Sequence, residues 1–134
     1  DMAFRKFLGA AAGGRPWIVY GGGEQPRDFT FVSDAVRANL LAADDPSDCG
    51  VYNIGGGARI ALREALEVLR SKAIEHGVAD TVTIEHHDAV KGDVRHTYAD
   101  GARAREALGF EARVSLAGGL DAEARWVAAR RRAE

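Results

Sequence analysis

The residue best suited to bind a charged ligand in this sequence is Arg27, which follows a glycine-rich loop. Two short runs of β-branched and aromatic residues, Trp17–Tyr20 and residues 29–32, are separated by three glycines and a proline, which predicts two strands joined by a loop. Glycine lets a backbone approach a ligand closely, and the planar guanidinium of arginine matches a phosphate group. The stretch therefore favours phosphate recognition. The alternative is a plain β-hairpin in which Arg27 only pairs with a neighbouring carboxylate.

Three further patterns contain residue types that act in sites. Residues 91–100 form a second polar loop with an arginine and two aspartates. The adjacent His86 and His87 suggest a metal site, but neighbouring residues of a strand point to opposite faces, so their imidazoles could not easily share one ion. We therefore predict no metal site. The glycines at 55–57 fit neither the dinucleotide nor the P-loop fingerprint and are interpreted as a structural turn.

The composition is that of an ordinary folded domain. The chain has 134 residues, of which 46% are apolar and 28% charged, and its net charge is −2. This length predicts one domain that can bury a core. Nucleic acid selects clustered positive charge, and the only dense basic run, Arg130 to Arg132, is interpreted as the end of a solvated helix. We expect neither a nucleic-acid nor a membrane partner.

Cysteine use and the start of the sequence suggest a context for the protein. The single cysteine, Cys49, cannot form an internal disulfide, and no apolar run approaches the ~20 residues that span a membrane. With no signal peptide expected, a cytoplasmic location is the default. The chain opens at Asp1 inside a helical pattern, without an initiator methionine or a preceding cap. This opening predicts a piece of a longer protein.

Alternating helices and short strands are expected along the chain. The elements predicted after the first two strands are a helix over residues 35–43 with an N-cap at Ser33 or Asp34, a strand over 51–54, a helix over about 62–76, a strand over 82–86, a helix over 101–108 capped by Asp100 and closed by Gly109, and a final helix from Ser115 or Leu116. A further amphipathic helix at the start of the chain contains Phe4, Phe7 and Leu8 and stops at Gly13 and Gly14. In the last helix, Leu120, Ala124 and Val127 share the expected buried face, with Trp126 as a core anchor. This alternation predicts an α/β domain.

The order and spacing of these motifs resemble the C-terminal part of an extended short-chain dehydrogenase/reductase of the NAD-dependent nucleotide-sugar epimerase/dehydratase group, closest to UDP-glucose and UDP-glucuronate 4-epimerases. The match covers nearly the whole chain and includes residues 1–7, 16–34, 52–57, 92–100, 108–109 and 119–126. The resemblance implies that residues 1–134 are a small α/β substrate-binding domain, the nucleotide-sugar-binding portion of such an enzyme. It also implies that the Rossmann half, which binds NAD, is absent.

The resemblance also assigns roles to four residues. It implies that Arg27 contacts the diphosphate, that Tyr20 lies along the nucleoside, that Asp93 accepts a hydrogen bond from a ribose hydroxyl, and that Arg95 lies near the phosphates. The family's catalytic Tyr-x-x-x-Lys pair is missing, because the three tyrosines are followed four residues later by Glu24, Gly56 and Ala102. No catalytic residue is therefore expected in this chain. Two positions depart from the family pattern: Val90 replaces a frequent phosphate-contacting arginine, and Gly22 replaces a common aspartate.

The resemblance implies a reaction for the full-length parent. NAD takes a hydride from a UDP-sugar, a transient keto sugar forms, and the hydride returns to the other face, which inverts the sugar at C4. NAD would be bound mainly by the missing half, and the parent would be a homodimer. The fragment alone is expected to be inactive. The alternatives are the corresponding half of a dehydratase or decarboxylase, and a non-catalytic nucleotide-binding regulatory domain of the same fold.

Overall fold

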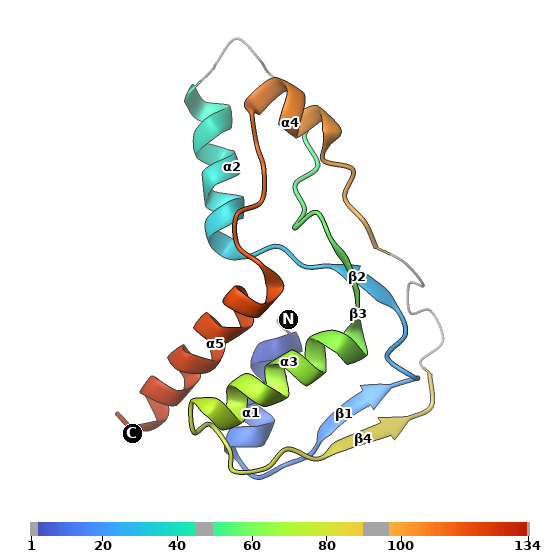
Figure 1. Ribbon diagram of the computed structural model, residues 1–134, viewed down its shortest axis with the longest axis vertical. Helices are drawn as coiled ribbons and strands as arrows, with labels where there is room; N and C mark the ends of the chain where they lie inside the picture. The colour runs from blue at the N-terminus through green and yellow to red at the C-terminus, as the bar shows by residue number, and fades with distance from the viewer. Residues whose placement is uncertain (1–2, 45–49, 90–96, 134) are drawn as a thin grey trace.

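The computed structural model of the protein describes residues 3–44, 50–89 and 97–133 (Figure 1). These ranges contain, in chain order, α1 (Ala3–Ala12), β1 (Trp17–Tyr20), β2 (Pro26–Asp28), α2 (Val32–Asp44), β3 (Arg59–Ala61), α3 (Leu62–Glu75), β4 (Ile84–His87), α4 (Ala102–Leu108) and α5 (Leu116–Arg131). Helices and short strands alternate, as the sequence predicted. Within the described ranges, no helix is long and apolar enough to cross a membrane.

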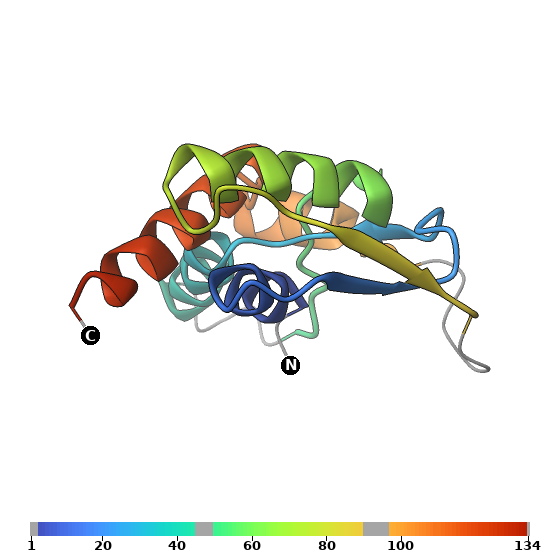
Figure 2. The same cartoon turned by 90° about the horizontal axis from the view of Figure 1, so that it is seen from below.

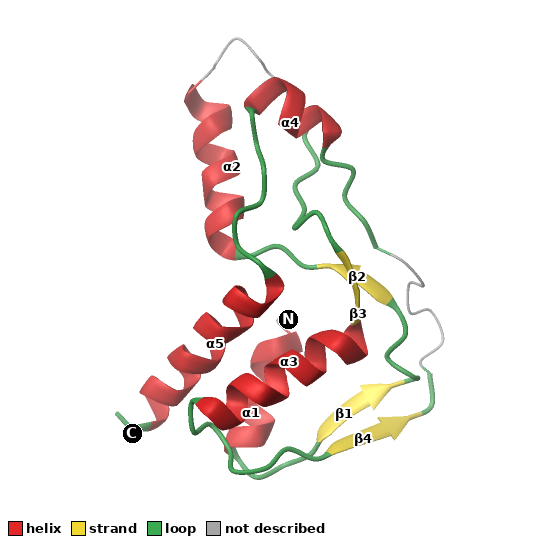
Figure 3. Cartoon of the chain, viewed as in Figure 1, coloured by secondary structure: helices red, strands yellow, loops and turns green. Residues whose placement is uncertain are grey.

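The helices lie in two groups, α2 with α4 and α1 with α3 and α5 (Figure 3), and each group contains its own hydrophobic cluster. The larger cluster lies among α1, β1, α3 and α5, where Leu8, Trp17, Leu69 and Ala124 are fully buried. Figure 2 shows α1 and α3 as separate layers, with the strand pair β1–β4 extending to one side. The smaller cluster, centred on Phe110, lies between α2 and α4. The larger cluster forms because each helix presents an apolar stripe that only its neighbours can cover.

The strands form two separate pairs rather than one sheet. β1 pairs in parallel with β4, so that Trp17 is opposite Ile84 and Tyr20 opposite His87. β2 pairs antiparallel with β3, so that Arg27 is opposite Ile60. Along β1 the side chains alternate between the core and solvent, which follows the period of two that a strand imposes. The glycine-rich loop thus connects two different sheets, and the plain hairpin does not form.

The strand predicted at residues 29–32 is wrong. The second strand covers Pro26–Asp28 instead, and α2 begins at Val32. The ring of Phe29 packs against Phe4 of α1 at a centroid distance of 4.9 Å, and the carbonyl of Phe31 accepts hydrogen bonds from the first turn of α2. This run therefore contacts α1 and α2 and does not pair with another strand of the described chain.

Three other expectations are also wrong. Residues 51–54 form no strand, and Tyr52 and Ile54 pack instead on the cluster around Phe110. Neither Ser33 nor Asp34 is an N-cap, since α2 begins at Val32 and contains both residues. Trp126 is not a core anchor but is 40% exposed, with the guanidinium of Arg5 4.1 Å from its ring centroid. Short apolar runs and a single tryptophan do not reveal which partners will cover them.

The predicted helix ends agree well with the structure. Ser115 is the N-cap of α5, and its Oγ accepts a hydrogen bond from Gly118 N at 3.2 Å. The N-cap of α4 is Gly101 rather than the predicted Asp100, although Asp100 Oδ1 accepts a hydrogen bond from Ala102 N at 3.0 Å. Gly109 closes that helix with φ of 63°, as expected. Leu120, Ala124 and Val127 of α5 are buried as expected. Capping residues act locally, which explains why the sequence reveals them.

Candidate functional site

The loop between β1 and β2 is docked on the first turn of α3. Gly23 O accepts a hydrogen bond from Arg63 N at 2.9 Å, and Gln25 O accepts one from Leu62 N at 3.3 Å. These donors are among the N–H groups that the start of a helix leaves without an intrahelical partner. Gly23 has φ of 71°, and a Cβ there would lie 3.3 Å from Arg63 N. The loop is therefore held in one shape by backbone contacts that require glycine.

Tyr20 stands at the entrance of this loop. Its side chain is 51% exposed, and its ring meets that of His87 edge to face at 5.9 Å. The neighbouring His86 uses Nδ1 in a hydrogen bond with Gly21 O at 3.0 Å. The two histidines thus have different partners, one on each side of β4. The exposed tyrosine ring at the end of a strand offers a flat surface for a planar ligand group.

Arg27 stands at the exit of the same loop. It is the central residue of β2, is half-buried, and donates from Nη1 to Pro26 O at 3.1 Å. Pro26 O also accepts a hydrogen bond from Thr97 N at 3.4 Å, and Ala89 lies beside Gly21. The described residues on either side of the gap at 90–96 therefore both contact the loop between Tyr20 and Arg27. Asp93 and Arg95 lie outside the described residues, so their predicted roles stay predictions.

Asp28 is a structural residue of this region that the sequence argument did not single out. Its Oδ1 accepts a hydrogen bond from Gly56 N at 2.7 Å, and its Oδ2 accepts one from Ala99 N at 3.4 Å. A Cβ on Gly56 would lie 2.0 Å from the carbonyl oxygen of Phe29, a separation that real Cβ atoms do not reach. The glycine turn at 55–57 is thus packed directly against β2. Its interpretation as structural fits this close approach.

A polar cavity of about 300 Å³ lies on the face of β2 that contains Asp28. Its lining includes Thr30, Asn53, Thr97 and Tyr98. Adjacent residues of a strand point to opposite faces, so Arg27 faces away from this cavity. Neither Tyr20 nor Arg27 lines this cavity.

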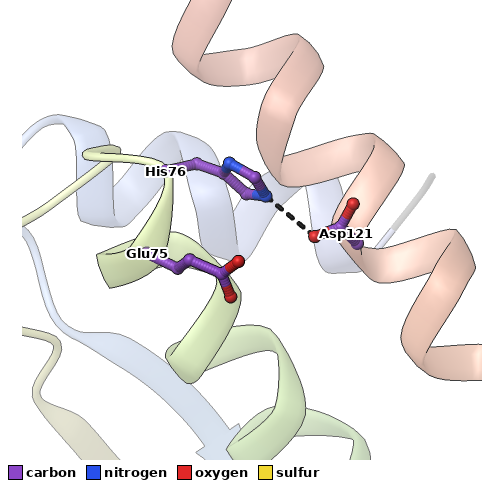
Figure 4. A group of neighbouring side chains, drawn as sticks. All are labelled: Glu75, His76 and Asp121. Carbon is purple, nitrogen blue, oxygen red and sulfur yellow. Dashed lines mark hydrogen bonds and ion pairs between the residues drawn. The ribbon is translucent and has the colours of Figure 1, made fainter.

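A second cluster of polar side chains joins α3 to α5 (Figure 4). Glu75, His76 and Asp121 place one ligand atom each within 4.8 Å of one another, an arrangement that could hold a metal ion. However, Lys72 Nζ lies 2.7 Å from Glu75 Oε2 and 3.3 Å from Asp121 Oδ1, so a cation is already supplied by the protein. Arg125 also pairs with Asp121. These contacts identify the cluster as a link between two helices.

Charge pairing in this cluster shifts two pKa values. The hydrogen bond from His76, followed by those from Lys72 and Arg125, lowers the pKa of Asp121 to about 2, although partial burial opposes the shift. The hydrogen bonds to Glu75 and Asp121 raise the pKa of Lys72. Each group is thus stabilised in its charged form. The ion pairs persist over the whole neutral range.

A third polar contact fixes the chain that follows β2. Asp34 is buried, and its carboxylate accepts hydrogen bonds from Arg113 N at 3.1 Å and Val114 N at 3.0 Å. Burial alone would raise the pKa of this carboxyl, but those two N–H groups and the nearby Arg37 hold the pKa below its ordinary value. The start of α2 is thereby tied to the segment before α5.

Comparisons with known proteins agree with this architecture. Residues 3–122 match the family described as GDP-mannose 4,6 dehydratase. The chain resembles the structure of a UDP-glucose 4-epimerase with UDP-glucose from Thermotoga maritima, with a TM-score of 0.82 and 32% identity over 100% of this chain and 41% of that one. A UDP-glucuronic acid 4-epimerase from Bacillus cereus, in complex with UDP-glucuronic acid and NAD, gives a TM-score of 0.80 and 29% identity over 95% of this chain and 40% of that one.

A relative of different activity is equally similar in sequence. A dTDP-glucose 4,6-dehydratase from Streptomyces griseus is 32% identical over 121 residues, which are 90% of this chain and 36% of that protein. In each of these three comparisons the chain spans about two fifths of the relative's length. The described fold therefore corresponds to one portion of each larger protein.

Proposed function

Because the chain belongs to the GDP-mannose 4,6 dehydratase family, within the extended short-chain dehydrogenases that include nucleotide-sugar epimerases, we propose that it is the nucleotide-sugar-binding portion of such an enzyme. UDP-sugars are the proposed substrate class. The Thermotoga maritima structure with UDP-glucose and the Bacillus cereus structure in complex with UDP-glucuronic acid support this choice.

The observation that most supports the proposal is the docked glycine loop with Tyr20 at one end and Arg27 at the other. A nucleotide sugar has a planar base at one end of a diphosphate with about two negative charges, and a guanidinium binds such oxygens through charge-assisted hydrogen bonds. An exposed tyrosine ring suits the base or ribose. We assign the nucleoside to Tyr20 and the diphosphate to Arg27, with Asp93 and Arg95 as further predicted contacts.

The residues of this chain do not fit a dinucleotide site of their own. The glycine turn at 55–57 is filled by protein, since Gly56 N already donates to Asp28 and a side chain there would meet Phe29. We therefore propose that NAD, which supplies the hydride chemistry when bound, is held mainly by a part of the enzyme outside this chain. The proposed reaction of the whole protein is inversion at C4 of the sugar, and no chemical step is assigned to residues of this chain.

Two alternatives remain for the whole protein. Dehydration or decarboxylation of a nucleotide sugar is supported by the similarity to the Streptomyces griseus dehydratase. A non-catalytic nucleotide-binding regulator would keep the same fold and the same binding residues. All three possibilities predict that this chain binds a nucleotide diphosphate, so binding tests the shared part of the proposal.

Calorimetric titration of UDP into the chain tests that shared part. We expect saturable binding that Arg27→Ala weakens about a hundredfold, since removing a charge-assisted contact costs on the order of 2–3 kcal/mol. Arg70→Ala is the matched control, because Arg70 forms only an exposed ion pair with Glu67 on α3. Equal UDP affinities of Arg27→Ala and the wild type would remove Arg27 from the site.

A further inference from the structure

Asp28 joins the strand that contains Arg27 to two distant segments of the chain. Its carboxylate accepts hydrogen bonds from Gly56 N, 28 residues later, and from Ala99 N, 71 residues later. We propose that Asp28 is a positioning residue for the phosphate site, which acts by fixing the backbone that holds Arg27. This inference rests on the proposed function and adds to it the residue that orients its main cation.

β2 needs such support because its own ladder is short. The strand has three residues, and among the described residues it pairs only with β3, in a two-stranded sheet. Isolated pairs of strands are marginally stable in water, so contacts outside the ladder must define the position of β2. Such contacts include the two hydrogen bonds of Asp28 and the bond from Thr97 N to Pro26 O. They flank Arg27 on both sides.

The glycine turn and Ala99 restrict the position of the Asp28 carboxylate on one side. A Cβ on Gly55 would lie 2.5 Å from Asp28 Oδ2 and 2.8 Å from the Cβ of Ala99. The glycine turn and Ala99 therefore lie against the carboxylate group. If the carboxylate moved away, the N–H group of Gly56 would lose its hydrogen-bond acceptor. A hydrogen bond to an ionised acceptor is stronger and geometrically stricter than one to a neutral acceptor.

Asp28 is unsuited to bind the diphosphate itself. Its side chain projects from the face of β2 opposite to Arg27, and its two oxygens already have backbone donors. A carboxylate near a diphosphate would also repel it. Arg59, which is opposite Asp28 in the strand pair, stacks its guanidinium 4.2 Å from the ring centroid of Tyr98. The effect of Asp28 on a ligand must therefore pass through the position of Arg27.

A double-mutant cycle tests this dependence. UDP is titrated by calorimetry into the wild-type chain, Asp28→Asn, Arg27→Ala and the double variant. Asparagine has nearly the same size as aspartate, but its amide cannot accept both backbone hydrogen bonds. We expect Asp28→Asn to weaken UDP binding about tenfold when Arg27 is present, and to have little further effect in the Arg27→Ala chain. Such coupling would not arise from a general loss of stability.

Controls separate this inference from the proposed function. Asp80→Asn removes an exposed aspartate elsewhere and should leave UDP affinity unchanged. Circular dichroism checks that each variant is folded, and Asp28→Glu, which keeps the charge but displaces the carboxylate, replaces Asp28→Asn if the latter unfolds. An unchanged affinity, or equal losses with and without Arg27, overturns the inference while leaving Arg27 in place. A wild-type chain that does not bind UDP overturns both proposals.

Discussion

His76 Nε2 lies 2.8 Å from Asp121 Oδ1, and this contact fastens the end of α3 to the second turn of α5. The two helices also share the larger hydrophobic cluster, through Leu69 and Ala124 among others. The polar link thus lies beside an apolar interface, where it can fix the relative position of helices whose apolar contacts are non-directional.

The low pKa of Asp121 predicts a specific acid sensitivity. Because this pKa is about 2 in the folded chain and 3.8 ordinarily, the carboxylate stabilises the fold fully above about pH 4, and the contribution is lost as the pH falls towards 2. Asp121→Asn should therefore lose less stability than the wild type between about pH 4 and pH 2. Urea unfolding across this range measures the difference. Parallel pH curves for the two proteins would contradict the assignment, and Asp80→Asn provides the charge-matched control.

Two glycine substitutions should have opposite effects on stability. A methyl group at Gly56 would lie 2.0 Å from the carbonyl oxygen of Phe29, so Gly56→Ala should destabilise the chain by about 2 kcal/mol or more through backbone displacement. Gly9 lies inside α1 with no atom within 4 Å of an added Cβ, and Gly9→Ala should stabilise by about 0.5–1 kcal/mol. Urea unfolding at neutral pH compares both with the wild type. A neutral Gly56→Ala would disprove the close approach of the turn to β2.

The two tryptophans should differ in their importance for stability. Trp17 is completely buried beside Phe7, whereas Trp126 is partly exposed near two arginines. Trp17→Ala should reduce the free energy of unfolding by about 3–5 kcal/mol. Trp126→Ala should reduce it by only about 1–2 kcal/mol, since an exposed cation–π contact contributes about 0.5–1 kcal/mol and Trp126 forms two of them. The reverse order in chemical unfolding would contradict the described packing of α5.

Arg27→Lys should restore only part of the UDP affinity that Arg27→Ala loses. An ammonium supplies the charge but not the planar pair of donors, so we expect an affinity about tenfold below that of the wild type. Calorimetry on all three proteins under the same salt conditions gives the order. A lysine variant with full affinity would indicate a purely electrostatic contact and remove the geometric part of the assignment.

The chain alone should not convert UDP-sugars in the presence of NAD. None of its tyrosines is followed by lysine at the spacing of the family's catalytic pair, and general acid–base catalysis needs such a group within reach of the substrate. Chromatography after incubation with NAD and UDP-glucose measures any epimer. Conversion above a control without protein would show that this portion suffices for catalysis.

The sequence predicts the helices and their ends well because those signals are local. Leu62, Leu66 and Leu69 follow the period of a helix, and α3 lies within one residue of its predicted span. The same reasoning fails for residues 29–32 and 51–54, because a short apolar run has no period that distinguishes a strand from a segment packed on helices. Sequence patterns correctly placed Tyr20 and Arg27 at the two ends of a glycine loop.

The role of Asp28 could not be predicted in the same way. Its hydrogen-bond partners are far away in the sequence, and neither Gly56 nor Ala99 has a side chain that signals the contact. The only local hint is the position of this aspartate directly after Arg27. Long-range contacts to backbone N–H groups leave no pattern in residue type, so a structure is needed to find them.

The hydrogen bonds of Asp34 also have a consequence for the order in which the protein can form during synthesis. Its partners, Arg113 N and Val114 N, follow it by 79 and 80 residues. At a synthesis rate of about 5–20 residues per second, the nascent chain would present Asp34 roughly 4–16 s before these partners are made. Until then the carboxylate must remain hydrated, since burial without donors is costly. The start of α2 can therefore reach its final position only after residues 113 and 114 have been made.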